Sequence, residues 1–170
     1  MIKMEATVKL HSYNYSDYRT YLYAALFIAG NIIFPQLAHL MPQGGLVWLP
    51  IYFFTLVGAY KYGWRVGVLT ALLSPMVNHL LFGMPSAAVL PAILLKSTVL
   101  AVVASTVAAR TRKVSIAALL LVVVAYQAVG TAGEMLMVPA WTDAFQDLRI
   151  GWPGMLLQVV GGYLLLKSLK

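Results

Sequence analysis

Cysteine is absent from the sequence, and charged residues are scarce. The lack of thiols excludes disulfides, thiolate metal sites and a cysteine nucleophile. Charged residues make up only 10% of the 170 residues, hydrophobic residues make up 61%, and the mean hydropathy is +0.82. A water-soluble domain of this length has no interior large enough for so many apolar side chains. The composition therefore predicts a protein whose solvent is a lipid bilayer.

The sequence also lacks the signatures of common enzyme classes. The motifs H-E-x-x-H, G-x-S-x-G and G-x-x-x-x-G-K-[ST] are missing, and His11, His39 and His79 lie far apart without ligand-like spacing. We therefore expect no enzyme activity, no metal and no cofactor. The net charge of +7 arises from basic residues between the hydrophobic runs, not from a patch interleaved with aromatics. This placement argues against a nucleic-acid partner and is explained by membrane topology.

The hydrophobic runs predict an all-α membrane protein, a bundle of six transmembrane helices in one domain. Residues 1–17 are polar and form a cytoplasmic N-terminal segment, with Ser16 or Asp17 placed to cap the first helix. The first run starts after Arg19, is too long for the core of a signal peptide and lacks a cleavage site, so we expect it to be retained. Within the domain 18–170, turn formers and charges separate spans at 18–40, 46–60, 66–82, 86–109, 114–137 and 151–169.

The basic residues alternate between the predicted loops, as the positive-inside rule requires of an even number of spans. One set of loops and both termini contain Lys3, Lys9, Arg19, Lys61, Arg65, Arg110, Arg112, Lys113, Lys167 and Lys170. The other set contains only Arg149. We therefore expect a multi-pass protein of the cell (inner) membrane with both termini in the cytoplasm.

Lys96 is the one basic residue inside a predicted span. A lysine at the centre of a membrane helix costs about 2.5 to 3.5 kcal/mol, so it requires a partner or water. Lys96 lies roughly 15 Å below the outer helix end and Glu134 roughly 6 Å below it, at 1.5 Å per residue. A direct ion pair would then need helix tilt or a bridging group, and a substrate is one such bridge.

Other polar residues fall mostly in the outer half of the spans, which predicts a cavity open to the outside. The candidate substrate-binding residues are Lys96, Glu134, Gln127, Gln158, Asn78, His79, Trp141 and Asn31. Gln127, Gly130 and Glu134 share one helical face, and Trp141 in the longest outer loop is placed to stack on a planar ligand. The alternative is structural: amide side chains link membrane helices by hydrogen bonds, and Lys96 and Glu134 only pair with each other.

The segment Ala25-Leu26-Phe27-Ile28-Ala29 has small residues four apart, which lets another helix approach closely. With six helices, both termini inside and an outward polar pocket, the chain resembles the substrate-binding S component of an energy-coupling-factor (ECF) vitamin transporter. Residues 49–63 and 67–75 also resemble spans two and three of that family.

The resemblance implies that Ala25 and Ala29 dock on a transmembrane coupling subunit. It also implies a pocket near the outer surface, among spans four to six and under the loops after spans one and five, with Lys96, Glu134, Gln158 and Trp141 as candidates. A vitamin-like metabolite would be captured from outside, and the S component would topple in the bilayer while two separate cytoplasmic ATPases supply energy. Two alternatives stay open: a TspO-like tetrapyrrole-binding protein, whose five helices put the termini on opposite sides, and a membrane assembly factor with no small ligand.

Overall fold

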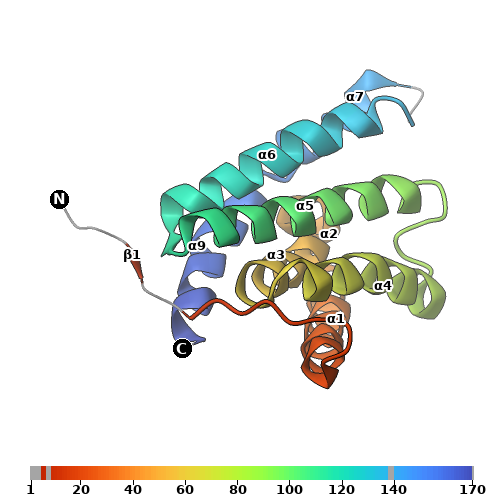
Figure 1. Ribbon diagram of the computed structural model, residues 1–170. Coiled ribbons are helices and arrows are strands. Elements are labelled where there is room, and N and C mark those ends of the chain that lie inside the picture. Colours follow the sequence, from red (N-terminus) through yellow and green to blue (C-terminus); the bar gives the residue numbers. More distant parts are fainter. Residues whose placement is uncertain (1–4, 7–8, 138–139, 170) are drawn as a thin grey trace.

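The computed structural model describes residues 5–6, 9–137 and 140–169, and their architecture is almost entirely helical (Figure 1). Lys3, Lys170 and Val138, which figure in the predicted topology and loops, lie outside the described residues. Four helices are long and apolar enough to cross a bilayer: α1 (Tyr18–Ala38), α4 (Trp64–Phe82), α5 (Leu90–Thr111) and α6 (Ile116–Glu134). The chain is therefore a multi-helix membrane protein with four candidate spans.

The predicted count of six spans is not confirmed, because two of the helices are short. The second run is divided into α2 (Gly44–Trp48) and α3 (Pro50–Tyr62), and α3 has only 13 residues. Leu49 between them adopts a left-handed conformation with a φ of 46°, and Pro50 has no N–H to continue the helix. The last run forms α9 (Trp152–Ser168), whose 17 residues are fewer than the roughly 20 of a typical span.

The remaining elements are short. The connection after α6 was predicted as a loop, and it contains two single-turn helices, α7 (Trp141–Ala144) and α8 (Gln146–Ile150). Near the N-terminus, β1 (Glu5–Ala6) pairs antiparallel with β2 (Val114–Ser115), which precedes α6. Of the two predicted caps for α1, Asp17 is the one used: its carboxylate accepts the Arg19 N–H at 2.9 Å.

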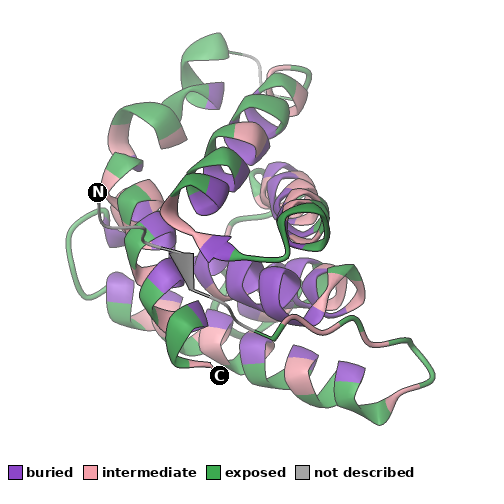
Figure 2. Cartoon of the chain, turned by 60° about the vertical axis from the view of Figure 1, so that its left-hand side comes forward, coloured by how far each residue is buried: buried purple, intermediate pink, exposed green. Residues whose placement is uncertain are grey.

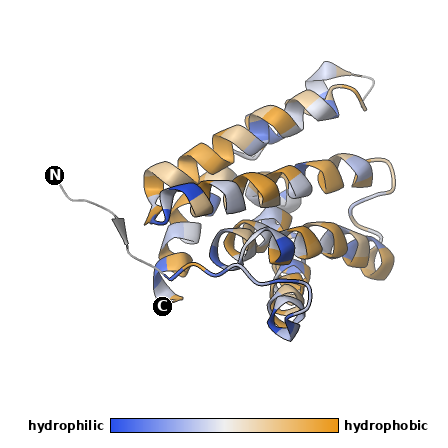
Figure 3. Ribbon diagram, viewed as in Figure 1, coloured by the Kyte–Doolittle hydropathy of each residue, from blue (hydrophilic) through white to orange (hydrophobic). Residues whose placement is uncertain are grey.

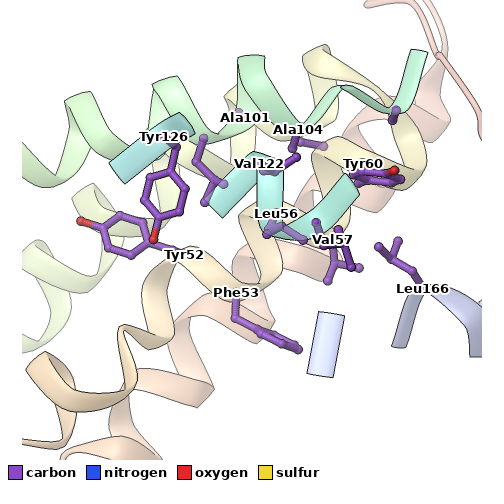
Figure 4. Close-up of a cluster of buried hydrophobic side chains, with 14 of the residues drawn as sticks. Tyr52, Phe53, Leu56, Val57, Tyr60, Ala101, Ala104, Val122, Tyr126 and Leu166 are labelled. Atoms are coloured by element: carbon purple, nitrogen blue, oxygen red, sulfur yellow. The ribbon is translucent and has the colours of Figure 1, made fainter. Parts of the chain in front are cut away.

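The core is centred on α3, the shortest of the long helices. It contacts α1, α4, α5 and α9, and Leu56, Val57 and Ala59 on it are fully buried. Figure 4 shows Leu56 and Val57 among side chains from α5, α6 and α9. Because α3 is enclosed by the other helices, its length is not set by the thickness of a bilayer.

The outer surface of the bundle is apolar, as expected of helices that face lipid. Buried residues face the interior and exposed ones line the outside (Figure 2), and hydrophobic residues dominate α5 and α6 (Figure 3). Large apolar side chains are exposed on all four candidate spans, among them Leu22, Leu26, Ile33, Leu80, Val102, Leu120, Leu121 and Val124. A bilayer would cover this surface without cost.

The two groups of loops predicted from charge lie at opposite ends of the bundle. What we call the basic end comprises residues 9–17, 60–65, 110–115 and 165–169. Three hydrogen bonds join these segments: His11 N–H to Lys61 C=O (2.8 Å), Lys61 Nζ to Leu169 C=O (2.6 Å) and the Tyr60 hydroxyl to Lys113 C=O (2.6 Å). The N-terminal segment and the C-terminal helix thus meet at one end. The opposite end comprises residues 39–49, 83–89, 135–137 and 140–151.

The imidazole of His11 is packed at the basic end and surrounded by positive charge. Its ring stacks on those of Tyr13 and Tyr62, with centroids 5.4 and 5.9 Å away. Burial lowers the pKa of His11, and three nearby cations lower it further: Lys61, Lys9 and Arg19. Both effects favour the neutral imidazole over the charged one.

Candidate functional site

A buried ion cluster joins three elements near the opposite end of the bundle. The Lys96 side chain on α5 is 2% exposed, and its Nζ pairs with the carboxylate of Glu134, the last residue of α6. Its second partner is Asp147 on α8, whose Oδ2 lies 2.8 Å from Nζ. The lysine thus fastens the connection after α6 to the side of α5.

Glycine at position 130 makes this pairing possible. A Cβ atom on Gly130 would lie 2.7 Å from Cγ of Lys96, so any side chain there would displace the lysine. The expectation that this glycine leaves room on its helix face is confirmed, and the stem of Lys96 fills the space. The sequence left helix tilt or a bridging group as the two ways to join Lys96 and Glu134, and no bridging group is needed, because the close α5–α6 contact at Gly130 brings the two side chains together directly.

The cluster carries more negative than positive charge. One ammonium faces two carboxylates, Glu134 and Asp147, whose side chains are 14% and 15% exposed. Burial of an uncompensated charge is costly, so a cation would be favoured beside these two carboxylates. This excess of acid makes the surroundings attractive to a positively charged group.

Buried amides lie alongside the cluster on α6 and α9. The Tyr126 hydroxyl donates to Gln158 Oε1 and accepts from Gln127 Nε2, both at 3.0 Å. The Tyr126 ring also contacts that of Tyr52 on α3, with centroids 5.7 Å apart (Figure 4). Among the described residues, Gln127 Oε1 and Gln158 Nε2 have no hydrogen-bond partner. These two atoms retain capacity to bind a polar group.

The other predicted amides, Asn31 and Asn78, form a second buried cluster between α1, α3 and α4. Asn31 Nδ2 donates to the hydroxyls of Thr55 (2.9 Å) and Ser74 (3.3 Å), and its Oδ1 accepts the Phe54 N–H (3.2 Å). These bonds account for the whole side chain of Asn31 as a link between helices.

Asn78 differs from Asn31 in that one of its atoms is unused. Its Nδ2 donates to the carbonyls of Asn31 and Ser74, both at 2.9 Å. Its Oδ1 is buried and has no partner among the described residues, although the residue is only 1% exposed. A buried acceptor without a donor is costly, so it favours a ligand or water that donates to it.

A cavity of about 600 Å³ adjoins Asn78 at the opposite end of the bundle. Its apolar wall comes from the end of α1, the start of α3 and the start of α5, and includes Pro35, Ile51 and Ile93. Residues of α2 and of the connections complete it: His39, Met41, Gln43, Gly44, Gly45, Leu46, Met84, Pro85, Ser86 and Val89. The volume lies within the roughly 300 to 1,000 Å³ of small-molecule sites, and an apolar wall with few polar groups is typical of them.

The remaining predicted site residues are placed apart from these groups. His79 Nδ1 lies 2.8 Å from the Pro85 carbonyl and so holds the connection between α4 and α5. Trp141 at the start of α7 is 74% exposed, and neither Lys96 nor Glu134 belongs to the cavity wall just described. Ala25 and Ala29 are both exposed on the outer face of α1.

Sequence reasoning missed Asp147 as a partner of Lys96. The residue lies in the outer loop predicted before residue 151. The available signal was a lysine inside one span together with two aspartates, Asp143 and Asp147, in this loop. The tyrosines Tyr52 and Tyr126 were also missed, because tyrosine is common near membrane surfaces and its pattern is uninformative. Within the described residues, no three His, Asp or Glu side chains gather as metal ligands.

Comparisons of the chain with protein-family models, with curated proteins and with solved structures found no match.

Proposed function

We propose that this membrane protein is the substrate-binding subunit, the S component, of an ECF-type importer. It captures a small vitamin-like metabolite from outside the cell and delivers it with energy from two partner ATPases. The observation that carries the proposal is the cavity at the end opposite the basic one, which is lined in part by Asn78, a residue with an unpartnered buried Oδ1. Under the positive-inside rule this end faces outward.

The position of the ion cluster gives it a role in closing the site. Lys96 holds Asp147 on α8, and α8 packs against α2, two glycines of which line the cavity. The cluster therefore does not line the cavity itself. It holds α8 in place, and α8 in turn supports the part of the wall that α2 forms. Its excess acid favours a ligand that carries an amino or other cationic group toward Asp147.

The outer face of α1 is suited to a helical partner. Ala25 and Ala29 lie exposed between the larger exposed side chains of Leu22, Leu26 and Ile33. Two small residues four apart leave a shallow depression into which a second membrane helix packs closely. This face supports docking on a coupling subunit.

A membrane assembly factor without a small ligand is the second candidate. The observation that favours it is the direct pairing of Lys96 with Glu134 and Asp147, since no ligand is needed to satisfy the lysine. A TspO-like protein is less favoured, because its five helices would separate the termini. Here the hydrogen bonds of Lys61 and His11 bring the N-terminal segment and the end of α9 together.

The partner is tested by co-purification. A tagged chain is expected to retain a coupling subunit and two ATPases, and Ala25→Trp with Ala29→Trp should release them. Ala128→Trp, at an exposed alanine of α6, is the matched control and should leave the complex intact. Absence of any co-purifying ATPase from the unmodified chain would contradict the proposal.

The outward opening is tested by labelling, since the chain has no native cysteine. A membrane-impermeant maleimide added to intact cells is expected to react with Ser86→Cys at the cavity and not with Ser16→Cys at the basic end. The reverse pattern would place the cavity on the cytoplasmic side and exclude uptake through it.

A further inference from the structure

A second large groove lies at the basic end of the bundle, far from the cavity already described. Its volume is about 840 Å³, and it is bordered by α5, by the junction of α3 and α4, and by residues 10–12 of the N-terminal segment. None of its lining residues is acidic. The groove plays no part in the proposed capture of a metabolite.

The groove combines positive charge at its mouth with apolar walls. Arg110 and Arg112 lie at the end of α5, and both side chains are exposed. Neither has a carboxylate partner among the described residues, where the ion pairs found are those of Lys96. By contrast, the nearby Arg65 is engaged: it donates to the Tyr13 carbonyl (3.3 Å) and lies over the Trp64 ring.

Below the arginines, the groove continues along one face of α5. Val102, Ser105, Thr106 and Ala109 line it with the spacing i, i+3, i+4, i+7. The ten residue steps from Val102 to Arg112 span about 15 Å at 1.5 Å per residue. This is half of a hydrocarbon core of roughly 30 Å, the depth of one leaflet.

The hydroxyls on this face do not make it polar. The Thr106 hydroxyl donates to the Val102 carbonyl at 2.7 Å, and the Ser105 hydroxyl donates to the same carbonyl at 3.0 Å. Both are therefore satisfied within α5, and the opposing wall contributes Ala59 and Trp64. The groove thus presents two guanidinium groups, which have no carboxylate partner within the described part of the chain, at the level of the headgroups. At the level of the acyl chains it presents a low-polarity channel.

We propose that this groove is a binding site for one anionic phospholipid, with its phosphate between Arg110 and Arg112 and an acyl chain along Val102 to Ala109. Basic pockets between membrane helices select anionic headgroups, and each Lys or Arg near the surface strengthens binding about fivefold. The occupant is a lipid rather than a soluble anion. The apolar part of the groove below Arg110 and Arg112 is as long as one leaflet is deep, whereas free phosphate would contact only the arginines.

The test counts lipids retained by the delipidated full chain in native mass spectrometry, titrated with phosphatidylglycerol or with phosphatidylcholine of the same chains. The wild type is expected to bind one phosphatidylglycerol selectively, and Arg110→Gln with Arg112→Gln should weaken it about thirtyfold. Arg149→Gln, which removes a guanidinium at the opposite end, is the matched control and should have no effect.

The acyl-chain half of the site is tested separately. Ala109→Trp fills the groove and should abolish retention of the lipid, whereas Ala117→Trp, at an exposed alanine outside it, should not. Equal binding of the two lipids, a change of less than threefold in the double arginine variant, or displacement of the lipid by millimolar inorganic phosphate would each overturn the proposal.

Discussion

Replacement of Lys96 by methionine is expected to destabilise the protein through the carboxylates that it leaves behind. The lysine is 2% exposed, and it neutralises Glu134 and Asp147, which are themselves about one-seventh exposed. Breaking a buried ion pair costs about 3 to 5 kcal/mol, because the remaining charge stays in a medium of low polarity. Partial exposure of both carboxylates reduces this, so we expect a loss of about 3 kcal/mol in the free energy of unfolding.

The same reasoning predicts a rescue. When Lys96→Met is combined with Glu134→Gln and Asp147→Asn, no charge remains in this cluster, and most of the lost stability should return. Lys61→Met is the matched control, since Lys61 is equally buried but donates to the Leu169 carbonyl. It should not be rescued by the same two changes. Equilibrium unfolding in mixed micelles measures each variant, and a triple variant no more stable than Lys96→Met would refute the reasoning.

Three further predictions concern single positions. Gly130→Ala should cost about 1 to 3 kcal/mol in unfolding free energy by displacing the lysine stem, whereas Gly162→Ala, whose new methyl would meet its nearest neighbour at 3.4 Å, should be neutral or stabilising. The lowered pKa of His11 means that the undocked N-terminal segment takes up a proton near pH 6.5 before the docked one does. The protection factors of the amides of residues 9–17, which correct the exchange rates for the intrinsic rate at each pH, should therefore fall as the pH falls from 7.5 to 5.5, and His11→Gln should remove this dependence. Arg112→Gly should raise the thermal stability of the lipid-free protein by about 1 kcal/mol, because Arg112 has a φ of 52°, a conformation that glycine adopts without strain; unchanged or lower stability in a thermal melt would contradict this.

The four candidate spans were predictable because each is a long apolar run between turn formers or charges. The separation of α2 from α3 was not, since it depends on a left-handed Leu49, a conformation that leucine seldom adopts and that tertiary packing imposes. Gly154 on α9 shows this packing: a Cβ there would lie 2.4 Å from the Trp48 carbonyl. Contacts of this kind join segments a hundred residues apart and leave no local pattern.

The candidate site was predictable in its residue types and only partly in its contacts. Lys96 and Glu134 were identified because ionisable groups are costly in hydrocarbon, and the structure brings them together. Asp147 was missed because it reaches Lys96 only through the path that the connection after α6 takes, and this path leaves no pattern in the sequence. The cost of a buried amide singled out both Asn31 and Asn78, and only the arrangement of donors around them separates the satisfied residue from the one with a free acceptor.

The central claim is that the cavity beside Asn78 holds a small molecule. The most direct measurement is small-molecule mass spectrometry of the purified chain, comparing Asn78→Leu with Asn31→Leu, which removes a similarly buried amide with no free acceptor. The account predicts one compound that co-purifies in near-stoichiometric amount with the wild type and with any folded Asn31→Leu protein, and that is lost from Asn78→Leu. Recovery of no compound from the wild type, or of equal amounts from both variants, would contradict it.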